Sequence, residues 1–456
     1  MKNARVVVAS FVSAVLLASA QQVVAEEVPS GVAVEQNAQR LDGLEQKLHL
    51  LESRLDAGKE AVAPKASSNE LLLRSADGIN QLKFNGYIQA VDRTFLDEGA
   101  ATDSFIIRRL VTTFDAKLLK NIDFRTQWDF GLGKVATNDT YLNVRLADAV
   151  QLRAGKFKVP FGLENLVSSA DLLFIERALP TALGPNRDIG FQLHGDQLGK
   201  KLNYAVGVFN GVADGATGDG DTGKEKEFAG RVFALPFTGS SIKPLEGLGI
   251  GIAGTYGKQD SGTAKAPNLA YYKTPGQENL FSYTANATPT TANTVVASGN
   301  HYRISPQGYY YFGPAGLLGE YVISTQNVSI NNKSAKLRND AWQVQLSYVL
   351  TGENATHKGV TPARPFIPGS SNSGWGAVQI VARYNALNID NDTFPTYARI
   401  TSAPRSIKAV AGGVNWYLND NLKVVLNYEQ STFDGGAAAG DRVAEKVFAS
   451  NVQVAF

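Results

Sequence analysis

The chain ends in a segment of alternating side chains whose last residue is aromatic. One face carries Phe448, Ser450, Val452, Val454 and Phe456, and the other carries Ala449, Asn451, Gln453 and Ala455. A strand that is apolar on one face and small or polar on the other suits lipid outside and water inside. It does not suit a soluble sheet packed on both faces. The ending therefore predicts an outer-membrane β-barrel, and a barrel with a wet interior is first a candidate pore.

The first twenty residues have the three parts of a secretory signal peptide. Lys2 and Arg5 form a positive start, residues 6–17 an apolar stretch, and Ala18-Ser19-Ala20 a small-residue cleavage site. A membrane-spanning helix needs about 20 apolar residues, which neither this stretch nor any later one reaches. We therefore expect residues 1–20 to be a signal peptide, and the mature protein to reside in the outer membrane of a Gram-negative bacterium.

Charge and cysteine content narrow the function further. The chain has 44 Lys and Arg against 42 Asp and Glu, so net charge does not indicate a nucleic-acid partner. It has no cysteine and four histidines, which excludes disulfides, thiolate metal sites and cysteine nucleophiles. We expect neither a cofactor nor a metal site.

A short heptad pattern precedes the barrel. Leucines recur at 3-4-3-4 spacing at Leu41, Leu44, Leu48, Leu51 and Leu55, as in the seam of a coiled coil. About three heptads are marginal alone, so the segment is better suited to holding an oligomer together. The alternative is one amphipathic helix docked on its own chain. We expect residues 21–70 to form a periplasmic coiled-coil and linker segment.

From Gln81 onward the hydrophobic period changes to two, the period of a strand. Sixteen candidate strands lie at 81–94, 105–117, 122–132, 139–147, 150–158, 190–196, 201–209, 226–235, 248–257, 301–312, 317–328, 335–351, 375–388, 405–417, 421–431 and 441–456. Sixteen is an even number, as single-chain bacterial barrels require. The predicted fold is all-β: a 16-stranded antiparallel transmembrane β-barrel over 71–456, with a short N-terminal coiled-coil helix.

The connections between these strands alternate between short and long. Short ones such as Lys120-Asn121 and Asn419-Asp420 are expected to be periplasmic turns, and long ones such as 159–189 to be extracellular or folded inward. One connection, 352–374, is long on the side where turns are otherwise short, and the pattern gives no reason for it.

The 159–189 connection has its own apolar residues, at Leu172, Leu173, Phe174 and Ile175, as well as polar ones at Ser168, Ser169, Glu176 and Arg177. Apolar loop residues need burial, and in a wide barrel the lumen wall can bury them. Folded inward, the loop would narrow the pore and place hydroxyl and guanidinium donors where anions pass. The alternative for Glu176 and Arg177 is a local ion pair that holds the loop.

Strand parity also predicts which charged side chains face the lumen. The basic and amide side chains expected there are Arg109, Arg125, Asn143, Arg145, Arg153, Arg231 and Arg383, and the acidic ones are Asp115, Asp129 and Glu429. Strict alternation would aim Arg108 at lipid unless a β-bulge turns it inward. For any one arginine, an ion pair with a neighbouring carboxylate is as good an interpretation as a role in conduction. Together such charges set pore selectivity.

Several motifs in order along 72–456 resemble the phosphate-selective porin O and P family. They include Phe105-Ile106-Ile107-Arg108-Arg109, Leu152-Arg153-Ala154-Gly155-Lys156-Phe157, Phe161-Gly162-Leu163-Glu164, Ser168-Ser169 followed by Glu176-Arg177, and Asn415-Trp416-Tyr417-Leu418-Asn419. The resemblance implies a homotrimer of sixteen-stranded barrels. It also implies that each barrel has an inward-folded third loop and an arginine-lined path for anions.

Matched residue by residue, this resemblance assigns roles and two departures. Arg108 and Arg109 match the paired arginines of the family's conducting ladder, and Ser168, Ser169 and Arg177 match its central phosphate site. Asn165 stands where phosphate-selective members carry a lysine, and Asn143 where they carry an aspartate. The resemblance thus implies anion preference with a weakened phosphate contact, which Asn165→Lys would be expected to strengthen.

The leading interpretation is a passive, anion-preferring channel for phosphate or similar small anions. A broader diffusion porin for organic acids or neutral solutes is the alternative in the same class. An outer-membrane barrel enzyme is another class, but the sequence has no Gly-x-Ser-x-Gly elbow and no histidine placed near a nucleophile. A structural tether acting through the coiled coil is compatible with transport.

Overall fold

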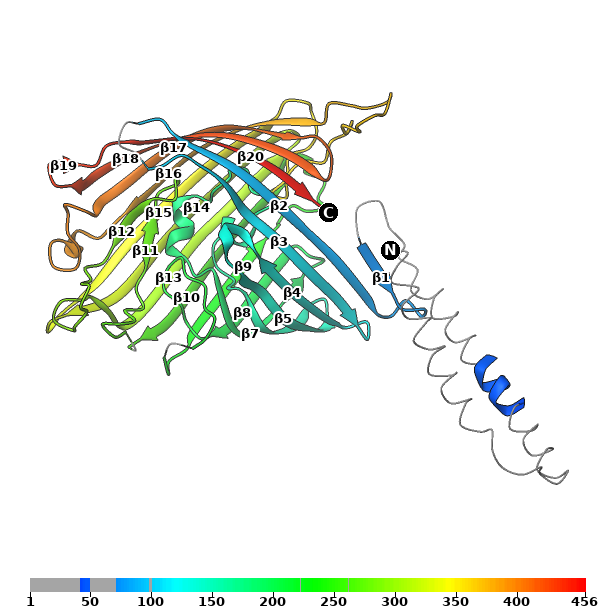
Figure 1. Cartoon of the computed structure of the whole chain (residues 1–456), viewed down its shortest axis with the longest axis horizontal. Coiled ribbons are helices and arrows are strands. Elements are labelled where there is room, and N and C mark those ends of the chain that lie inside the picture. The colour runs from blue at the N-terminus through cyan, green and yellow to red at the C-terminus, as the bar shows by residue number, and fades with distance from the viewer. Residues whose placement is uncertain (1–41, 50–70, 98–100, 222, 261) are drawn as a thin grey trace, which may run out of the picture. The chain divides into compact units, whose positions relative to one another are not determined.

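The computed structural model describes residues 42–49, 71–97, 101–221, 223–260 and 262–456. Sixteen long antiparallel strands form its barrel (Figure 1). They are β2 (Gln81–Phe95), β3 (Ser104–Leu118), β4 (Ile122–Asp129), β5 (Ala136–Ala147), β6 (Val150–Lys158), β7 (Arg187–Gln197), β8 (Leu202–Phe209), β9 (Glu227–Ala234), β10 (Leu248–Gln259), β13 (Val296–Phe312), β14 (Ala315–Ile330), β15 (Lys333–Val349), β16 (Ala377–Asn388), β17 (Pro404–Tyr417), β18 (Leu422–Ala437) and β20 (Glu445–Ala455). The prediction of a sixteen-stranded barrel is confirmed, with strand ends that differ by a few residues.

The barrel closes between its first and last long strands. Tyr87 of β2 pairs with Ala455 of β20, and Gly86 and Phe456 exchange both backbone hydrogen bonds. There are three further pairings of short strands. β1 (Leu71–Arg74) pairs with β2, β19 (Gly440–Asp441) pairs with β18, and β11 (Tyr271–Lys273) and β12 (Asn279–Ser282) form a hairpin. Closure matters because a free sheet edge cannot be satisfied within lipid.

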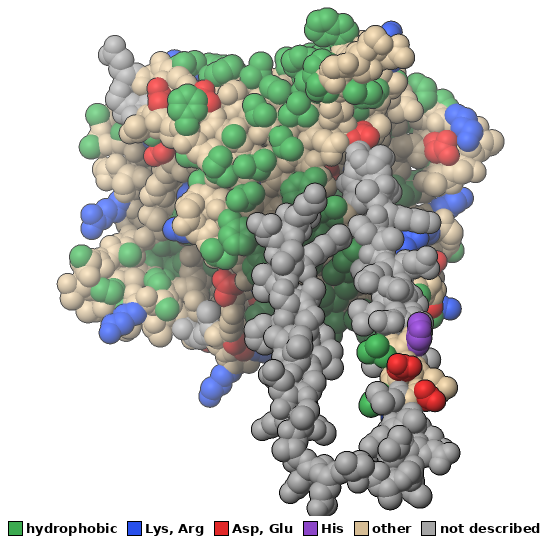
Figure 2. Space-filling model, turned by 45° about the vertical axis from the view of Figure 1, so that its right-hand side comes forward, with side chains coloured by type: hydrophobic (Ala, Val, Ile, Leu, Met, Phe, Trp, Pro, Cys, Tyr) green, Lys and Arg blue, Asp and Glu red, His purple; other side chains and the backbone are tan. Residues whose placement is uncertain are grey.

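The predicted alternation of the strands is confirmed in β15. Leu346 and Tyr348 are 54% and 48% exposed on the outside, whereas Gln343 and Gln345 are buried inside. Figure 2 shows hydrophobic side chains over much of the visible barrel wall. An apolar exterior and a polar interior match lipid outside and water inside.

One irregularity reverses the expected orientation of a single arginine. The register between β2 and β3 passes from Gln89 opposite Arg109 to Ala90 opposite Ile107, so Arg108 is an extra residue in a β-bulge. Both Arg108 and Arg109 therefore turn toward the lumen. This is the exception to strict alternation that the sequence allowed for.

Two long connections fold into the barrel and pack together. The connection between β6 and β7 contains the short 3-10 helices η2 (Glu164–Leu166) and η3 (Leu179–Leu183). Its Phe161 and Leu183 belong to the same buried cluster as Tyr272 and Phe281 of the β11–β12 hairpin. Three other short 3-10 helices, η1 (Gly131–Gly133), η4 (Lys243–Leu245) and η5 (Asn391–Thr393), lie in other connections.

The long connection between β15 and β16, which the strand pattern does not explain, has a small core of its own. Its Ala355 and Val360 are buried against Val349 and Tyr417 at the ends of strands. The ring of His357 stacks on Tyr309, a residue of β13, with centroids 5.2 Å apart. The segment therefore packs against the barrel interior at the end where the other connections are short.

Of the N-terminal segment, residues 42–49 are helical, and Leu44 and Leu48 are exposed there. The predicted signal peptide, and the positions Leu41, Leu51 and Leu55 of the predicted seam, lie outside the described residues. No helix among the described residues is long and apolar enough to cross a membrane.

Candidate functional site

The connection 159–186 lies against the inner wall of the barrel, as its apolar residues predict. Phe174 is buried against Val381 and Ala411, and Ile175 is buried against Val91 and Val425. These contacts remove from water the side chains that a surface loop would have exposed. The connection thus crosses the lumen and narrows it.

Side chains of the wall also bind the backbone of this connection. Lys423 donates from Nζ to the carbonyl oxygens of Ala170 and Leu172, at 3.2 and 2.9 Å. Asn427 accepts from the N–H of Ile175 at 2.9 Å, and Arg383 donates to the carbonyl of Glu176 at 3.0 Å. Buried backbone groups require such partners, so the polar wall fixes the path of the loop.

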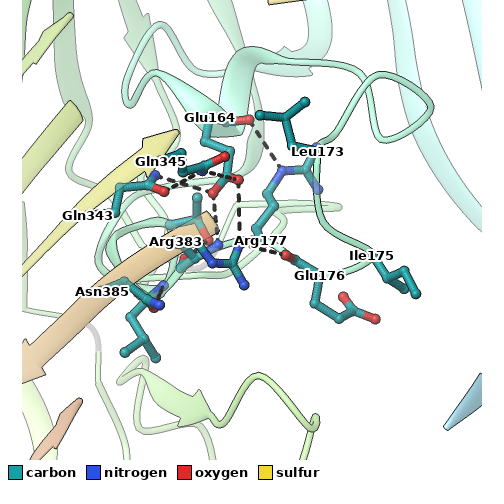
Figure 3. A network of polar contacts seen from close by, with 12 residues as sticks. Glu164, Leu173, Ile175, Glu176, Arg177, Gln343, Gln345, Arg383 and Asn385 are labelled. Atoms are coloured by element: carbon teal, nitrogen blue, oxygen red, sulfur yellow. Dashed lines mark hydrogen bonds and ion pairs between the residues drawn. The ribbon is translucent and has the colours of Figure 1, made fainter. Parts of the chain in front are cut away.

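Glu164 is the acidic anchor of the loop (Figure 3). Its carboxylate accepts from Gln345 at 2.8 Å and lies 3.8 Å from Arg383, while its backbone carbonyl faces Arg177. Arg383 is in turn bound to Glu429 at 2.9 Å. Arg383 and Glu429, both predicted to face inward, therefore serve the attachment of the loop.

The carboxylate of Glu176 lies within ion-pair distance of three arginine side chains. Arg108 donates to both of its carboxylate oxygens, at 2.5 and 3.0 Å, and Arg93 and Arg109 lie at 3.5 Å. Burial disfavours the ionised carboxylate, but these guanidinium groups outweigh it and lower the pKa of Glu176 to about 2. The local ion pair between Glu176 and Arg177 is not formed, so that alternative is wrong.

Arg177 instead binds neutral oxygens of its own loop. It donates to the carbonyl of Val167 at 2.9 Å, to Ser169 Oγ at 3.2 Å and to the carbonyl of Glu164 at 3.4 Å. Burial, followed by repulsion from Arg109, lowers its pKa to about 10. Arg177 therefore keeps its positive charge at neutral pH, and no carboxylate among the described residues forms an ion pair with it.

These residues border a central cavity of about 530 Å³. Among the described residues it is lined by eight basic side chains, namely Arg108, Arg109, Arg125, Arg153, Lys158, Arg177, Arg187 and Arg231. Ser168 and Ser169 line it too, whereas its acidic side chains are Asp129 and Asp139. Asp139 is bound to Arg187 at 2.8 Å, and Asp129 accepts two backbone N–H groups. The cavity therefore has a positive surplus.

Two more cavities adjoin the central one. An outer cavity of about 600 Å³, bordered by residues 213–217 and 269–277 of the long connections, shares Arg108, Arg109 and Arg177 with it. An inner cavity of about 490 Å³ shares Arg125 and Tyr141. The shared residues show that the cavities follow one another, with the two arginines of β3 and Arg177 at the outer junction.

Besides Arg177, three other cations of the central cavity form no ion pair with a carboxylate of the described residues. Arg153 lies over the ring of Tyr141, 4.4 Å from its centroid, and Arg231 over that of Phe233 at 4.5 Å. Lys158 donates to the carbonyl of Val167 at 2.8 Å. Strand register explains the neutral surroundings of Arg153, because its cross-strand neighbours are Asn143 and Gln192.

Comparison with known proteins agrees with this architecture. The family model of "Phosphate-selective porin O and P" matches residues 81–456. The chain belongs to this family. It is 23% identical over 389 residues to Porin O of Pseudomonas aeruginosa, covering 77% of this chain and 83% of that one.

Two solved barrels share the fold of this porin. The outer membrane channel DcaP of Acinetobacter baumannii has a TM-score of 0.53 at 10% identity, covering 84% of this chain and 99% of the other. In-vitro folded OmpT, an outer membrane protein of Vibrio cholerae, has a TM-score of 0.50 at 12% identity, covering 83% and 98%. The protein is accordingly a barrel of the Gram-negative outer membrane.

The remaining predicted site residues of this porin take different places. Arg125 lines both the central and inner cavities and is bound to Asp115 at 2.6 Å, while Arg145 lines the inner cavity and is bound to Asp123 at 2.7 Å. Asn143 does not border the central cavity; it hydrogen-bonds His194 at 2.7 Å. Arg125 and Arg145 are thus ion-paired, as Arg108 and Arg109 are with Glu176.

The family resemblance places Asn165 at the phosphate site with Ser168 and Ser169. In the structure the side chain of Asn165 does not border the same cavity as these serines. Its side chain is buried and donates to the carbonyl of Pro185 at 2.9 Å, and it borders the outer cavity rather than the central one. Sequence reasoning missed Lys158 and Arg187, which line the central cavity. Lys158 has the parity of Leu152, which is 48% exposed on the outside of the same strand, and the opposite parity to Arg153, so alternation alone could not have identified it.

Proposed function

We propose that this porin is a passive channel that prefers anions and conducts phosphate or similar small anions. The observation that carries the proposal is the lining of the central cavity, where basic side chains outnumber acidic ones. Both acids there are engaged by protein donors, whereas Arg153, Lys158, Arg177 and Arg231 have no carboxylate partner among the described residues. In a narrow, partly desolvated passage such charges act more strongly than in bulk water.

Reversal potential in planar bilayers under a KCl gradient tests this proposal. We expect chloride to be more permeant than potassium, and phosphate to reduce the chloride current. Arg177→Ala should shift the reversal potential toward potassium, and more so at low salt, where screening is weaker. A cation-selective wild-type channel at neutral pH would contradict the proposal.

A broader porin for organic acids is the second candidate. It is favoured by the aromatic side chains Tyr87, Tyr141, Phe157 and Tyr204, which border the central cavity beside its arginines. Such a mixed lining suits a carboxylate attached to an apolar body. Liposome swelling with benzoate, phosphate and a neutral sugar separates the candidates, since only a broad porin admits all three at similar rates.

We further propose that the protein works as a homotrimer held partly through its N-terminal segment. Leu44 and Leu48, both on the predicted seam, are exposed on the helix of residues 42–49, and exposed leucines at heptad spacing favour helix association. Deletion of residues 21–65 should weaken the trimer in mild detergent while leaving the barrel folded. Sedimentation of the full chain as a monomer would contradict the oligomer proposal.

A further inference from the structure

Two cations lie on the outer face of the barrel wall, near one end of β15. Lys336 and Arg338 are exposed, whereas Leu337 and Asn339, which alternate with them, are buried inside the barrel. β15 ends at Val349, beside the end of the barrel where the connections are short and which is therefore periplasmic. The two cations are near the start of the strand, so they lie at the extracellular end of the outer wall.

Aromatic side chains mark the depth of these cations in the membrane. Trp342 lies on the same face of β15, four residues from Arg338 toward the periplasm, and its ring centroid is 5.2 Å from that of Tyr384 on β16. Tyr384 is 37% exposed on the outside. Outward aromatic rings form girdles at the membrane–water interfaces of such barrels. The cations on the extracellular side of Trp342 therefore lie at the level of the outer-leaflet headgroups.

The two cations belong to one packed polar surface. Lys336 Nζ lies 5.2 Å from the centroid of the Tyr302 ring. Thr325 is opposite both Tyr302 and Arg338 in the strand register, and it is only 2% exposed although its parity directs it outward. Its neighbours therefore cover it and hold one another in place. We refer to Tyr302, Lys336 and Arg338 as the outer-wall patch.

The positive charge of the outer-wall patch is not neutralised by the protein. Neither Lys336 nor Arg338 forms an ion pair with a carboxylate of the described residues. The acids beside them have other donors: Asp340 accepts from Asn388 at 3.0 Å, and Asp390 accepts from the backbone N–H of Arg338 at 2.7 Å. Cations at a membrane surface attract anionic headgroups, and a guanidinium group matches the geometry of phosphate.

We propose that the outer-wall patch binds a headgroup phosphate of the glycolipid in the outer leaflet. In a Gram-negative outer membrane this lipid is lipopolysaccharide, whose lipid A portion carries phosphates on its sugars. Arg338 and Lys336 bind the phosphate through charge-assisted hydrogen bonds. Val344 and Leu346, 39% and 54% exposed further along the same face of β15, contact the acyl chains. The site faces away from the lumen, so it does not depend on which solute the channel conducts.

Binding of purified lipid A to the full chain in detergent, measured by native mass spectrometry, tests the site. The wild type should bind phosphorylated lipid A more tightly than the dephosphorylated form. Lys336→Gln combined with Arg338→Gln should raise the Kd for phosphorylated lipid A about 25-fold, since each basic side chain near an anionic lipid surface contributes about fivefold. Lys336→Arg combined with Arg338→Lys keeps both charges and should bind nearly as the wild type does.

The matched control removes two cations from the periplasmic end. Lys200→Gln combined with Lys201→Gln, in the turn between β7 and β8, should change the Kd by less than about twofold, because its charges act only through a screened field. Reversal potential in planar bilayers should be the same for Lys336→Gln with Arg338→Gln as for the wild type. A shifted potential would place these cations in the ion path and contradict an outer site. Heat-modifiable migration on gels verifies that each variant folds.

The other outcomes also decide the proposal. Equal binding of phosphorylated and dephosphorylated lipid A by the wild type would contradict it, as would equal losses in the two pairs of glutamine substitutions. Phosphatidylglycerol that binds as tightly as lipid A, with the same loss on substitution, would contradict the choice of the glycolipid. If Lys336→Gln with Arg338→Gln loses its oligomeric state in mild detergent while lipid A binding is unchanged, the outer-wall patch is a contact between subunits instead.

Discussion

Removing the charge of Glu176 should destabilise the inward-folded connection between β6 and β7. This buried carboxylate is the shared partner of Arg93, Arg108 and Arg109. In Glu176→Gln the three guanidinium groups keep their positions on the wall but lose the negative charge between them. The loop remains attached through Lys423, whose ammonium binds its backbone. We therefore expect a folded barrel with a less rigid constriction.

The structure gives the size of this effect in two ways. The pKa of Glu176 falls from 4.5 to about 2, and this difference corresponds to about 3 kcal/mol of stabilisation. Breaking a buried ion pair by removing one partner costs about 3–5 kcal/mol, which agrees. We expect Glu176→Gln to lower the free energy of unfolding in urea by about 3 kcal/mol, measured in lipid vesicles.

The same carboxylate predicts a pH dependence. Its pKa is lower in the folded protein than in the unfolded chain, so its contribution is complete above pH 4.5 and is lost as the pH falls through 2. Single-channel recordings of the wild type should be quiet at pH 5 and become noisy near pH 2. The Glu176→Gln channel should be noisy at both, and more anion-selective than the wild type at neutral pH.

Asp171→Asn provides the matched control, because it removes one negative charge from the same loop. The carboxylate of Asp171 forms no ion pair with the described residues, so its removal should change the unfolding free energy by less than about 1 kcal/mol. Equal stabilities and equal current noise in wild type and Glu176→Gln would refute the role assigned to the three arginines.

Three further results are expected. Asn143→Asp places a carboxylate opposite Arg153 across β5 and β6, and should reduce the chloride preference measured by reversal potential; an unchanged ratio would mean that Arg153 does not act on permeant ions. Raising the pH through about 10 should shift the wild-type reversal potential toward potassium, because burial lowers the pKa of Arg177 to about 10, and Arg177→Ala should show a smaller shift; equal shifts in both channels would mean that Arg177 does not contribute to it. Replacing residues 353–375 with a two-residue turn should raise single-channel conductance, since His357 stacks on Tyr309 inside the barrel; equal conductance would place that segment outside the ion path.

The fold was predictable because one physical rule covers the whole barrel. Every strand must present apolar residues to lipid and polar residues to water, so the period of two found all sixteen strands. Their ends were less predictable. β18 extends to Ala437, past the predicted 431, and β13 begins at Val296, before the predicted 301. Beyond the lipid the strands still pair through their backbones, although nothing there requires alternation of side chains.

The inward loop was predictable in its place but not in its contacts. Phe174 and Ile175 needed burial, and the lumen wall was the surface able to provide it. The partners of the charged residues beside them depended on distant strands. Arg93 and Arg108 reach Glu176 from β2 and β3, and the inward turn of Arg108 results from a bulge that the local sequence does not specify.

Register, rather than proximity in sequence, decides which lumen cations remain available to anions. Arg125 faces Asp115 directly across β3 and β4, and the pair forms. The cross-strand neighbours of Arg231 are Ala205 and Ala253, which cannot neutralise it, and Lys158 faces Arg187. A charge becomes part of the anion path only when no carboxylate reaches it from elsewhere either: Arg383 lies opposite Gln345 and Ala411 but is bound to Glu429. Composition cannot show this, since the chain as a whole is nearly neutral, with 44 basic and 42 acidic residues. The positive field of the pore therefore arises from how an almost balanced set of charges is paired.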